Sequence, residues 1–282
     1  MKKKIKTSRI LFYIAIAVLV VYILAPFLWL IIMSISSSTD LSTKPLSWIP
    51  KKVDFSSYQE LLHMGKNTHG ESFLFGLRNS VVTSFTTVLI SIIFTFPAAW
   101  VFSRYPGKKN VILKIAIVTF MLPPVAYALP IYKTLSTLGW LDNSFALAFV
   151  YCTLVMPFCA WLTKENIDAI PFELEESAII DGAGLFTRLF RIVFPLMMPA
   201  IGTVALLALL MSWDEYFYAM LFTNSNDAIT LPVVIANLAS GRQANYGLIA
   251  TGGVIAAAPP VIIGLLLQKS LVKGLTAGGV KG

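Results

Sequence analysis

The sequence predicts an all-α polytopic membrane protein with six transmembrane helices. Of its 282 residues, 57% are hydrophobic and only 13% are charged, with a mean hydropathy of +0.77. This composition is too apolar for a soluble globular domain. Apolar runs of the length that crosses a bilayer, about 20 residues, recur along the chain. With a cytoplasmic N-terminus, 15 Lys and Arg residues fall on the cytoplasmic side and 7 outside, as the positive-inside rule requires.

The first predicted span follows a basic N-terminus. Residues 1–9 carry five Lys or Arg residues, and residues 10–39 then contain no charge. The run is too long for a signal-peptide core and ends in no clear cleavage site, so we expect a retained anchor. Residues 40–75 are polar, and we expect an external segment with a short helix around residues 57–64.

The middle of the chain predicts three further spans. Spans 2, 3 and 4 cover residues 77–102, 111–135 and 144–163. A basic turn at residues 104–110 connects the first two of these on the cytoplasmic side. Span 3 contains Pro123, Pro124 and Pro130, so we expect it to be kinked or broken.

Two more spans complete the prediction. Span 5 covers residues 196–222, an outside loop covers 223–246, span 6 covers 247–268, and a basic tail covers 269–282. An even number of spans places both termini on one side of the membrane, and the Lys and Arg count assigns that side to the cytoplasm. We expect one membrane domain, divided into an N-terminal anchor with its external segment (1–75), a core (76–268) and a tail (269–282).

The chain carries no recognised catalytic motif. It contains no phosphate-binding loop, no HExxH and no GxSxG sequence, so we expect no catalytic, metal-binding or cofactor-binding residue and no enzyme activity. Cys152 and Cys159 are predicted to be packing residues. His63 and His69 lie in a polar loop with no Cys or His cluster nearby, so they are not expected to bind a metal. The basic residues are dispersed around the apolar runs, which argues against nucleic-acid binding.

A polar stretch at residues 173–199 separates two strongly apolar runs. Pro171 suits a first helical position, and acidic residues in the next turns oppose the positive end of a helix dipole. Gly182 and Gly184 can adopt positive φ and end that helix before a second segment at 186–193. We expect a helix-turn-helix with Glu175, Glu176 and Asp181 available on its surface.

The spacing in this stretch resembles the EAA loop of ABC-importer permeases. That loop reads Glu-Ala-Ala, three residues, Gly, nine residues, then Ile-x-Leu-Pro, and every gap matches here, with Ser177 and Phe194 as departures. The resemblance implies a segment that docks onto a separate ATPase. Its expected coupling residues are Glu175, Glu176, Ser177, Ala178, Asp181, Gly182, Ala183, Ile192 and Pro195.

The C-terminal tail, KGLTAGGVKG, resembles that of carbohydrate-importer permeases of the maltose-transporter type. The implied fold is that of a type I ABC-importer permease in a bacterial cytoplasmic membrane. The implied partners are a second permease, two ATPases that hold ATP and Mg²⁺, and an external solute-binding protein. Tail residues expected to contact the ATPases are Gly274, Leu275, Thr276 and Gly278.

Span 5 carries two acids beside aromatic residues. A carboxylate at the centre of a bilayer costs about 2.5–3.5 kcal/mol, so such groups usually face a cavity or a partner. Carboxylates and ring faces together suit a polyol, and the candidate pathway residues are Trp213, Asp214, Tyr216 and Tyr218. An interfacial aromatic belt is the alternative. We favour Asp214 over Glu215 because consecutive helical residues point about 100° apart.

The function predicted is therefore that of a non-catalytic permease subunit for a sugar or oligosaccharide. A permease for another small polar solute is an alternative within this class. A self-contained secondary transporter is the alternative from another class, but it requires ion-coupling residues and internally related halves that the sequence does not display. The sequence does not identify the substrate.

Overall fold

The computed structural model describes residues 2–43, 48–105, 107, 109–240 and 245–277, and regular structure in this part of the chain is helical. The chain divides into two compact units. The first contains residues 1–74 and 234–257, and the second contains residues 75–233 and 258–282. The first unit thus takes in residues 234–257, which the sequence-based division assigned to the core.

The first unit begins with three helices. They are α1 (Lys2–Ser34), α2 (Ser38–Ser42) and α3 (Ser56–Leu62). The short helix predicted around residues 57–64 is confirmed as α3, but the first span ends at Ser34 and not at residue 39. Helix α1 does not extend further because α2 starts there. Ser37 is the N-cap of α2, and its hydroxyl accepts a hydrogen bond from the Asp40 amide (3.2 Å). The Thr251 hydroxyl donates to the Ser34 carbonyl (3.2 Å) and ties the two segments of this unit together.

Longer helices supply the membrane spans. They are α4 (His69–Arg104), α5 (Lys109–Met121), α6 (Val125–Leu138), α7 (Ser144–Asp168), α10 (Phe194–Trp213) and α13 (Tyr246–Ala277). Among the described residues, five helical stretches, α1 included, are long and apolar enough to cross a membrane. The bent pair of α5 and α6 makes a sixth if it is counted as one span, which agrees with the predicted number.

The third span is broken, as its prolines predict. The axes of α5 and α6 differ by 99° across residues 122–124. Proline removes a backbone donor and clashes with a preceding carbonyl, so a break at this position is expected. The Tyr218 hydroxyl donates to the Pro124 carbonyl (3.4 Å), so a side chain from another helix partly satisfies the interrupted backbone.

The fifth span differs from the prediction of one helix over 196–222. Helix α10 ends at Trp213, and a separate helix, α11 (Phe217–Phe222), follows. The Glu215 carboxylate causes the new start, because it accepts hydrogen bonds from the amides of Tyr218 (2.8 Å) and Ala219 (3.2 Å). The Tyr151 hydroxyl donates to the Glu215 carbonyl (3.3 Å), so both polar ends of this residue are held.

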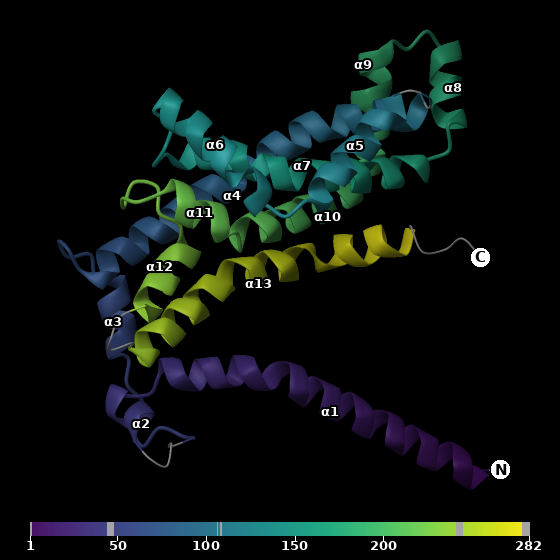
Figure 1. Cartoon of the computed structure of the whole chain (residues 1–282). Coiled ribbons are helices and arrows are strands. Elements are labelled where there is room, and N and C mark those ends of the chain that lie inside the picture. Colours follow the sequence, from purple (N-terminus) through teal and green to yellow (C-terminus); the bar gives the residue numbers. More distant parts are fainter. Residues whose placement is uncertain (1, 44–47, 106, 108, 241–244, 278–282) are drawn as a thin grey trace. The chain divides into compact units, whose positions relative to one another are not determined.

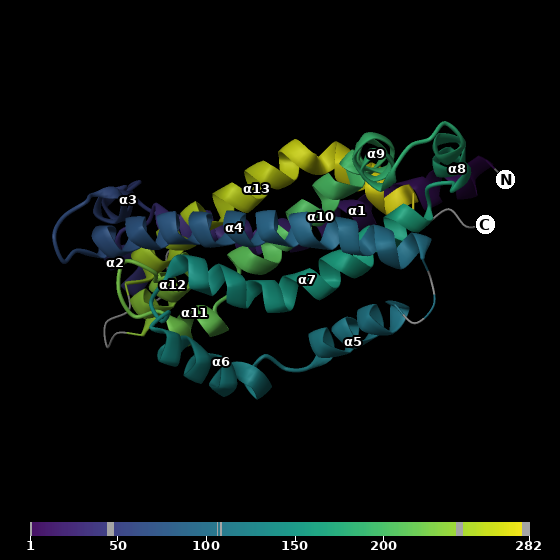
Figure 2. The same ribbon diagram turned by 90° about the horizontal axis from the view of Figure 1, so that it is seen from above.

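Helices α4 and α7 lie side by side in the second unit (Figure 1, Figure 2). The Thr83 hydroxyl donates to the Ser144 carbonyl and the Thr87 hydroxyl donates to the Ala148 carbonyl, both at 3.3 Å. Both residue numbers rise by four from one contact to the next, so the two helices run parallel. Interhelical hydroxyl bonds of this kind fix helix register in an apolar environment.

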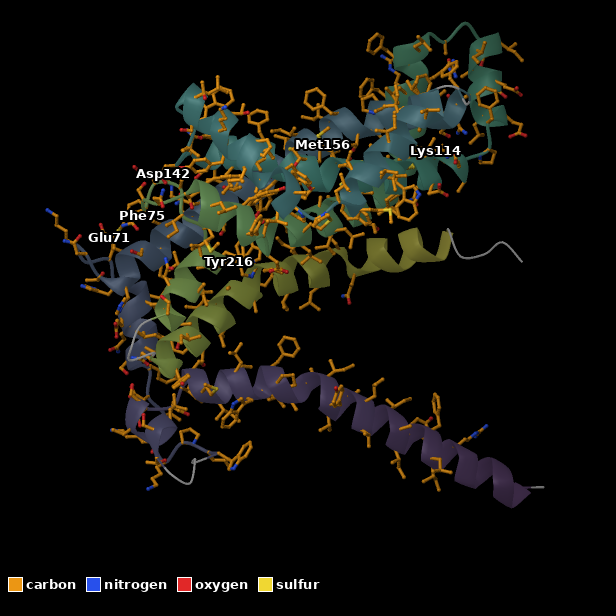
Figure 3. The ribbon with its side chains drawn as sticks, in the orientation of Figure 1. Glu71, Phe75, Lys114, Asp142, Met156 and Tyr216 are labelled. Carbon is orange, nitrogen blue, oxygen red and sulfur yellow. The ribbon has the colours of Figure 1, made fainter. Side chains whose placement is uncertain are left out.

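One end of this unit is organised by Asp142. Figure 3 shows Asp142 near this end, Lys114 near the opposite end and Met156 between them. The Asp142 carboxylate accepts hydrogen bonds from the amides of Asn224 (2.8 Å) and Ser225 (3.0 Å). Partial burial acts to raise the pKa of Asp142, but these hydrogen bonds outweigh it, and the pKa lies below its usual 3.8.

The outside loop predicted over residues 223–246 contains a short helix, α12 (Leu231–Ala239), which the sequence analysis did not predict. Much of the segment is buried, because polar side chains of α4 hold its backbone. The Asn79 side-chain amide donates to the Ile229 carbonyl (3.0 Å), and the Ser80 hydroxyl accepts from the Leu231 amide (2.8 Å).

We predict that Asp142→Ala lowers the melting temperature of the purified protein more than Asp142→Asn does. Alanine removes the acceptor of two backbone amides, and each lost hydrogen bond is worth about 0.5–1.5 kcal/mol. It also disfavours the positive φ of 57° at this position, which Asn tolerates. The measurement is thermal unfolding in detergent. Equal melting temperatures for the two variants would contradict the role given to the carboxylate.

Candidate functional site

The segment between α7 and α10 forms the predicted helix-turn-helix. Helix α8 (Glu173–Ile180) begins two residues after Pro171 and is followed by a turn and by a short helix, α9 (Leu185–Thr187). A π-helical stretch, η1 (Arg188–Val193), then leads into α10. Figures 1 and 2 both show α8 and α9 at one extremity of the second unit, at the end opposite to α6 and α11. We call this the α8 end.

A Schellman motif closes helix α8. The Ala183 amide donates to the Ala178 carbonyl (2.8 Å) and the Gly182 amide donates to the Ile179 carbonyl (3.0 Å). Gly182 has a φ of +83°, as predicted for the residue that ends the helix. Gly184 does not share this conformation, because its φ is −73° and it serves as the residue before α9. The turn therefore requires positive φ at only one of the two predicted glycines.

The second helix of the segment is continuous with span 5. Residues 185–213 are helical without interruption, whereas the prediction separated a segment at 186–193 from a span that begins at 196. The π-helical stretch widens the helix by one residue per turn, a feature that occurs often at functional sites. Its inner face packs into a buried cluster at the α8 end that includes Phe96, Trp100, Leu189, Val193 and Met197.

A buried carboxylate joins α8 to the rest of the unit. Glu175 is 0% exposed, and one of its oxygens accepts a hydrogen bond from Arg104 Nε at 2.6 Å. The other oxygen accepts from an Arg188 guanidinium nitrogen at 3.0 Å and from Trp100 Nε1 at 3.1 Å. The Arg188 guanidinium also lies 5.3 Å from the centre of the Trp100 ring. We call these four residues the Glu175 cluster.

The expectation that Glu175 is available on the surface is therefore wrong. Two guanidinium groups and an indole enclose it, and together they can stabilise a carboxylate that is removed from water. The other predicted coupling residues differ in exposure. Glu176, Ser177, Asp181, Gly182 and Pro195 are exposed, whereas Ala178, Ala183 and Ile192 are partly buried.

The outward face of the segment combines acids with large apolar side chains. Its exposed apolar residues include Leu174, Ile179, Ile180, Leu185, Phe186 and Phe190. Ile180 and Phe186 are 87% and 80% exposed, and the rings of Phe186 and Phe190 stack 6.4 Å apart. Exposed apolar groups beside carboxylates suit a partner groove that is apolar with a basic rim. We call this outward face, with Glu176 and Asp181, the loop surface.

The sequence interpretation missed Arg104, Arg188 and Trp100 as partners of Glu175. Arg104 was counted only as part of a basic cytoplasmic turn. It is 71 residues from Glu175 in sequence, so no local pattern connects the two. Arg188 is 13 residues away, and a helix-turn-helix hairpin could have suggested that pairing.

The structure does not gather the four predicted pathway residues on one exposed surface. Trp213 and Tyr218 are buried, whereas Asp214 and Tyr216 are exposed. Helix α10 ends at Trp213 and Asp214 is its C-cap, so the argument from helical side-chain directions does not apply to Asp214 and Glu215. Because Glu215 is used to cap α11, Asp214 is the acid left at the surface. Its role in a pathway stays a prediction.

The tail prediction lies at the edge of the described chain. The candidate span ends at Gln268, as predicted, but helix α13 continues to Ala277 and includes Gly274, Leu275 and Thr276. Gly278 lies outside the described residues. In the described part of the chain, no three His, Cys, Asp or Glu side chains are grouped so as to hold a metal ion.

Comparison with known proteins finds similarity over most of the chain. Residues 72–277 match the family described as binding-protein-dependent transport system inner membrane component. The chain is 31% identical to the trehalose/maltose transport system permease MalG of Thermococcus litoralis, over 98% of both chains. It is 30% identical to the melibiose/raffinose/stachyose import permease MelC of Bacillus subtilis, again over 98% of both.

A solved structure shares the fold. A chain of a bacterial ABC transporter that imports the acidic polysaccharide alginate superposes with a TM-score of 0.79 at 23% identity. The superposition covers 94% of this chain and 96% of that one. The agreement extends over almost the whole chain.

We predict that Gly182→Val distorts the turn whereas Gly184→Val does not. A side chain at the φ of +83° of Gly182 costs about 1–2 kcal/mol, and more for a β-branched residue. No neighbour lies within 4 Å of a Cβ at either glycine, so backbone conformation alone distinguishes them. Limited proteolysis at residues 181–188 measures the effect. Equal cleavage rates in the two variants would show that positive φ is not required.

Proposed function

Because this chain belongs to the family of binding-protein-dependent transport system inner membrane components, we propose that it is a permease subunit of an ATP-driven sugar importer. Members of this family are transport components of the inner membrane. The proposed substrate is a sugar or an oligosaccharide, since similar permeases are named for trehalose, maltose, melibiose and raffinose. The loop surface carries the proposal, because it presents apolar and acidic groups on a rigidly capped helix.

The complete importer contains this chain, a second permease, two ATPase subunits and an external solute-binding protein. ATP and Mg²⁺ bind to the ATPases, and this chain supplies no catalytic group. Both termini and the α8 end face the cytoplasm, where the ATPases dock. The distribution of Lys and Arg along the sequence supports this orientation.

Docking occurs through the loop surface. Ile180 and Phe186 enter an apolar groove of the ATPase, and Glu176 pairs with a basic residue at the rim of that groove. The apolar contacts supply affinity, while the carboxylate selects the register in which the helix binds. Residues of the C-terminal end of α13, including Gly274 and Thr276, provide a further contact with the ATPases.

The two permeases together line the sugar pathway, with Asp214 and Tyr216 as the contribution of this chain. Both are exposed at the break between α10 and α11. A carboxylate accepts hydrogen bonds from sugar hydroxyls, and an aromatic ring packs against the C–H face of a pyranose. A break in a membrane helix is tolerated where it lines a water-filled path.

Co-purification separates this proposal from a self-contained secondary transporter. An ATPase and a second permease accompany the tagged chain in mild detergent if it is an importer subunit. A chain that catalyses ion-coupled uptake alone in proteoliposomes would contradict the proposal.

We predict that Glu176→Lys abolishes association with the ATPase while leaving membrane insertion intact. A charged hydrogen bond at an interface is worth about 1.5–3 kcal/mol, and replacement by Lys places like charges together. The affinity for the ATPase should fall more than tenfold. Quantitative pull-down measures it, and Glu165→Lys is the matched control because Glu165 is an exposed acid of α7 outside the docking segment. Wild-type recovery of ATPase with Glu176→Lys would exclude the proposed contact.

We predict that Asp214→Asn raises the KM for sugar uptake severalfold without changing assembly. The amide keeps the size of the side chain and loses the charge that strengthens its hydrogen bonds to hydroxyls. Uptake of labelled trehalose, maltose and melibiose into proteoliposomes measures the effect. Asp227→Asn is the control, since Asp227 is an exposed acid beyond α11. Unchanged kinetics for every transported sugar would favour an interfacial aromatic belt.

A further inference from the structure

We propose that Glu175 is a positioning residue that transmits movement of α8 to the membrane helices, through Arg104 to α4 and through Arg188 to α10. This inference rests on the proposed function, because it assigns how a docked ATPase moves the permease. It concerns the buried side of α8, which faces the rest of this chain and so cannot contact an ATPase.

Helix α8 is attached to the unit mainly by this one side chain. All eight residues of α8 are described, and Glu175 is the only one of them that is buried. The large apolar side chains of the helix, Leu174, Ile179 and Ile180, point outward and are 46–87% exposed. In an ordinary amphipathic helix the apolar residues face the core. Here the apolar face is left for a partner, and a charged group holds the helix in place.

The partners of Glu175 come from the ends of two long helices. Arg104 is the last residue of α4, and Arg188 opens the π-helical stretch that continues into α10. Arg104 also donates to the Ile170 carbonyl at 3.0 Å, so the residues that follow α7 share the same attachment. One carboxylate therefore connects α8 with the ends of α4 and α10, and Arg104 joins the residues after α7 to the same group. A force applied to α8 by a docked subunit reaches α4 and α10 through this carboxylate.

The cluster has the directional bonding that such a joint requires. The two oxygens of Glu175 have separate donors at 2.6–3.1 Å, and bonds between charged groups are strong and geometrically specific. The side chains of Arg104 and Arg188 are 8% and 7% exposed, so water screens these bonds little. Each guanidinium has a second contact that limits its rotation. Arg104 donates to the Ile170 carbonyl, and Arg188 lies over the Trp100 ring.

A structural role and a transmitting role can be separated by replacing the charges in two ways. Glu175→Gln leaves two buried guanidiniums without a carboxylate and weakens the joint. The triple variant Glu175→Leu, Arg104→Leu, Arg188→Leu removes all three charges, and apolar replacement of a complete buried ion cluster is often neutral or stabilising. The triple variant should therefore keep the fold while it lacks the directional attachment of α8.

The experiment uses the complete reconstituted importer. Labelled trehalose is the transport probe, and its transport by the wild-type complex is the reference. We expect Glu175→Gln to retain ATPase in pull-down within twofold of wild type, because the loop surface is unchanged. We expect trehalose transported per ATP hydrolysed to fall at least tenfold. The triple variant should show near wild-type thermal stability with the same loss of transport per ATP. Glu165→Gln, an exposed acid on α7, is the matched control and should transport normally.

A spin label on α8 tests the attachment directly. Ser177→Cys is exposed, whereas the native Cys152 and Cys159 are buried and should not react. In the pair of permeases without ATPase, the label should become more mobile in Glu175→Gln and in the triple variant. Unchanged mobility, or recovery of transport together with stability in the triple variant, would overturn the inference. Absence of an ATPase from the wild-type pull-down would instead refute the proposed function.

Discussion

Backbone hydrogen bonding in a medium without water is the constraint on which the rest of this structure depends. A helix satisfies its own amides and carbonyls, so long apolar helices form wherever the chain crosses hydrocarbon. The two places where the membrane helices break show how strict the constraint is. Near residue 123 the Tyr218 hydroxyl reaches the Pro124 carbonyl, and near residue 215 the Glu215 carboxylate accepts the amides that start α11. Tyr218 follows directly from the second break and serves the first, so the two breaks support each other.

The same requirement governs the charges at the α8 end. Burying Glu175 is tolerable only because each of its oxygens has a charged donor, and Arg104 and Arg188 are in turn held by a carbonyl or an aromatic ring. Because this carboxylate holds α8, the large apolar side chains of the helix do not need to be buried. They form an exposed surface instead, which is unusual for a stable protein face and typical of an interface. The buried side of α8 is therefore held by charged groups, and its outward side exposes apolar groups.

Polar groups within the helices set how the helices fit together. Apolar side chains supply little net preference for one helix neighbour over lipid, so hydroxyl groups decide the register. Thr83 and Thr87 on α4 each reach a carbonyl of α7, four residues apart on both helices. At the Asp142 end, Asn79 and Asp142 hold the backbone of residues 224–229 in the same way. The unit is thus fixed by polar contacts at both ends and along one seam.

The sequence by itself determined the local features: the apolar runs, the break at the prolines of span 3, the start of α8 near Pro171 and the positive φ of Gly182. Each follows from the chemistry of one residue or from a short repeating pattern, so no knowledge of distant neighbours is needed. Tertiary structure alone decided that Glu175 faces inward, because its partner Arg104 is 71 residues away and only packing brings the two together. It also decided that Glu215 starts a new helix within span 5, since the carbonyl of that residue is satisfied by Tyr151 from another helix. Acids are placed by the donors around them, and in this chain those donors come from remote segments.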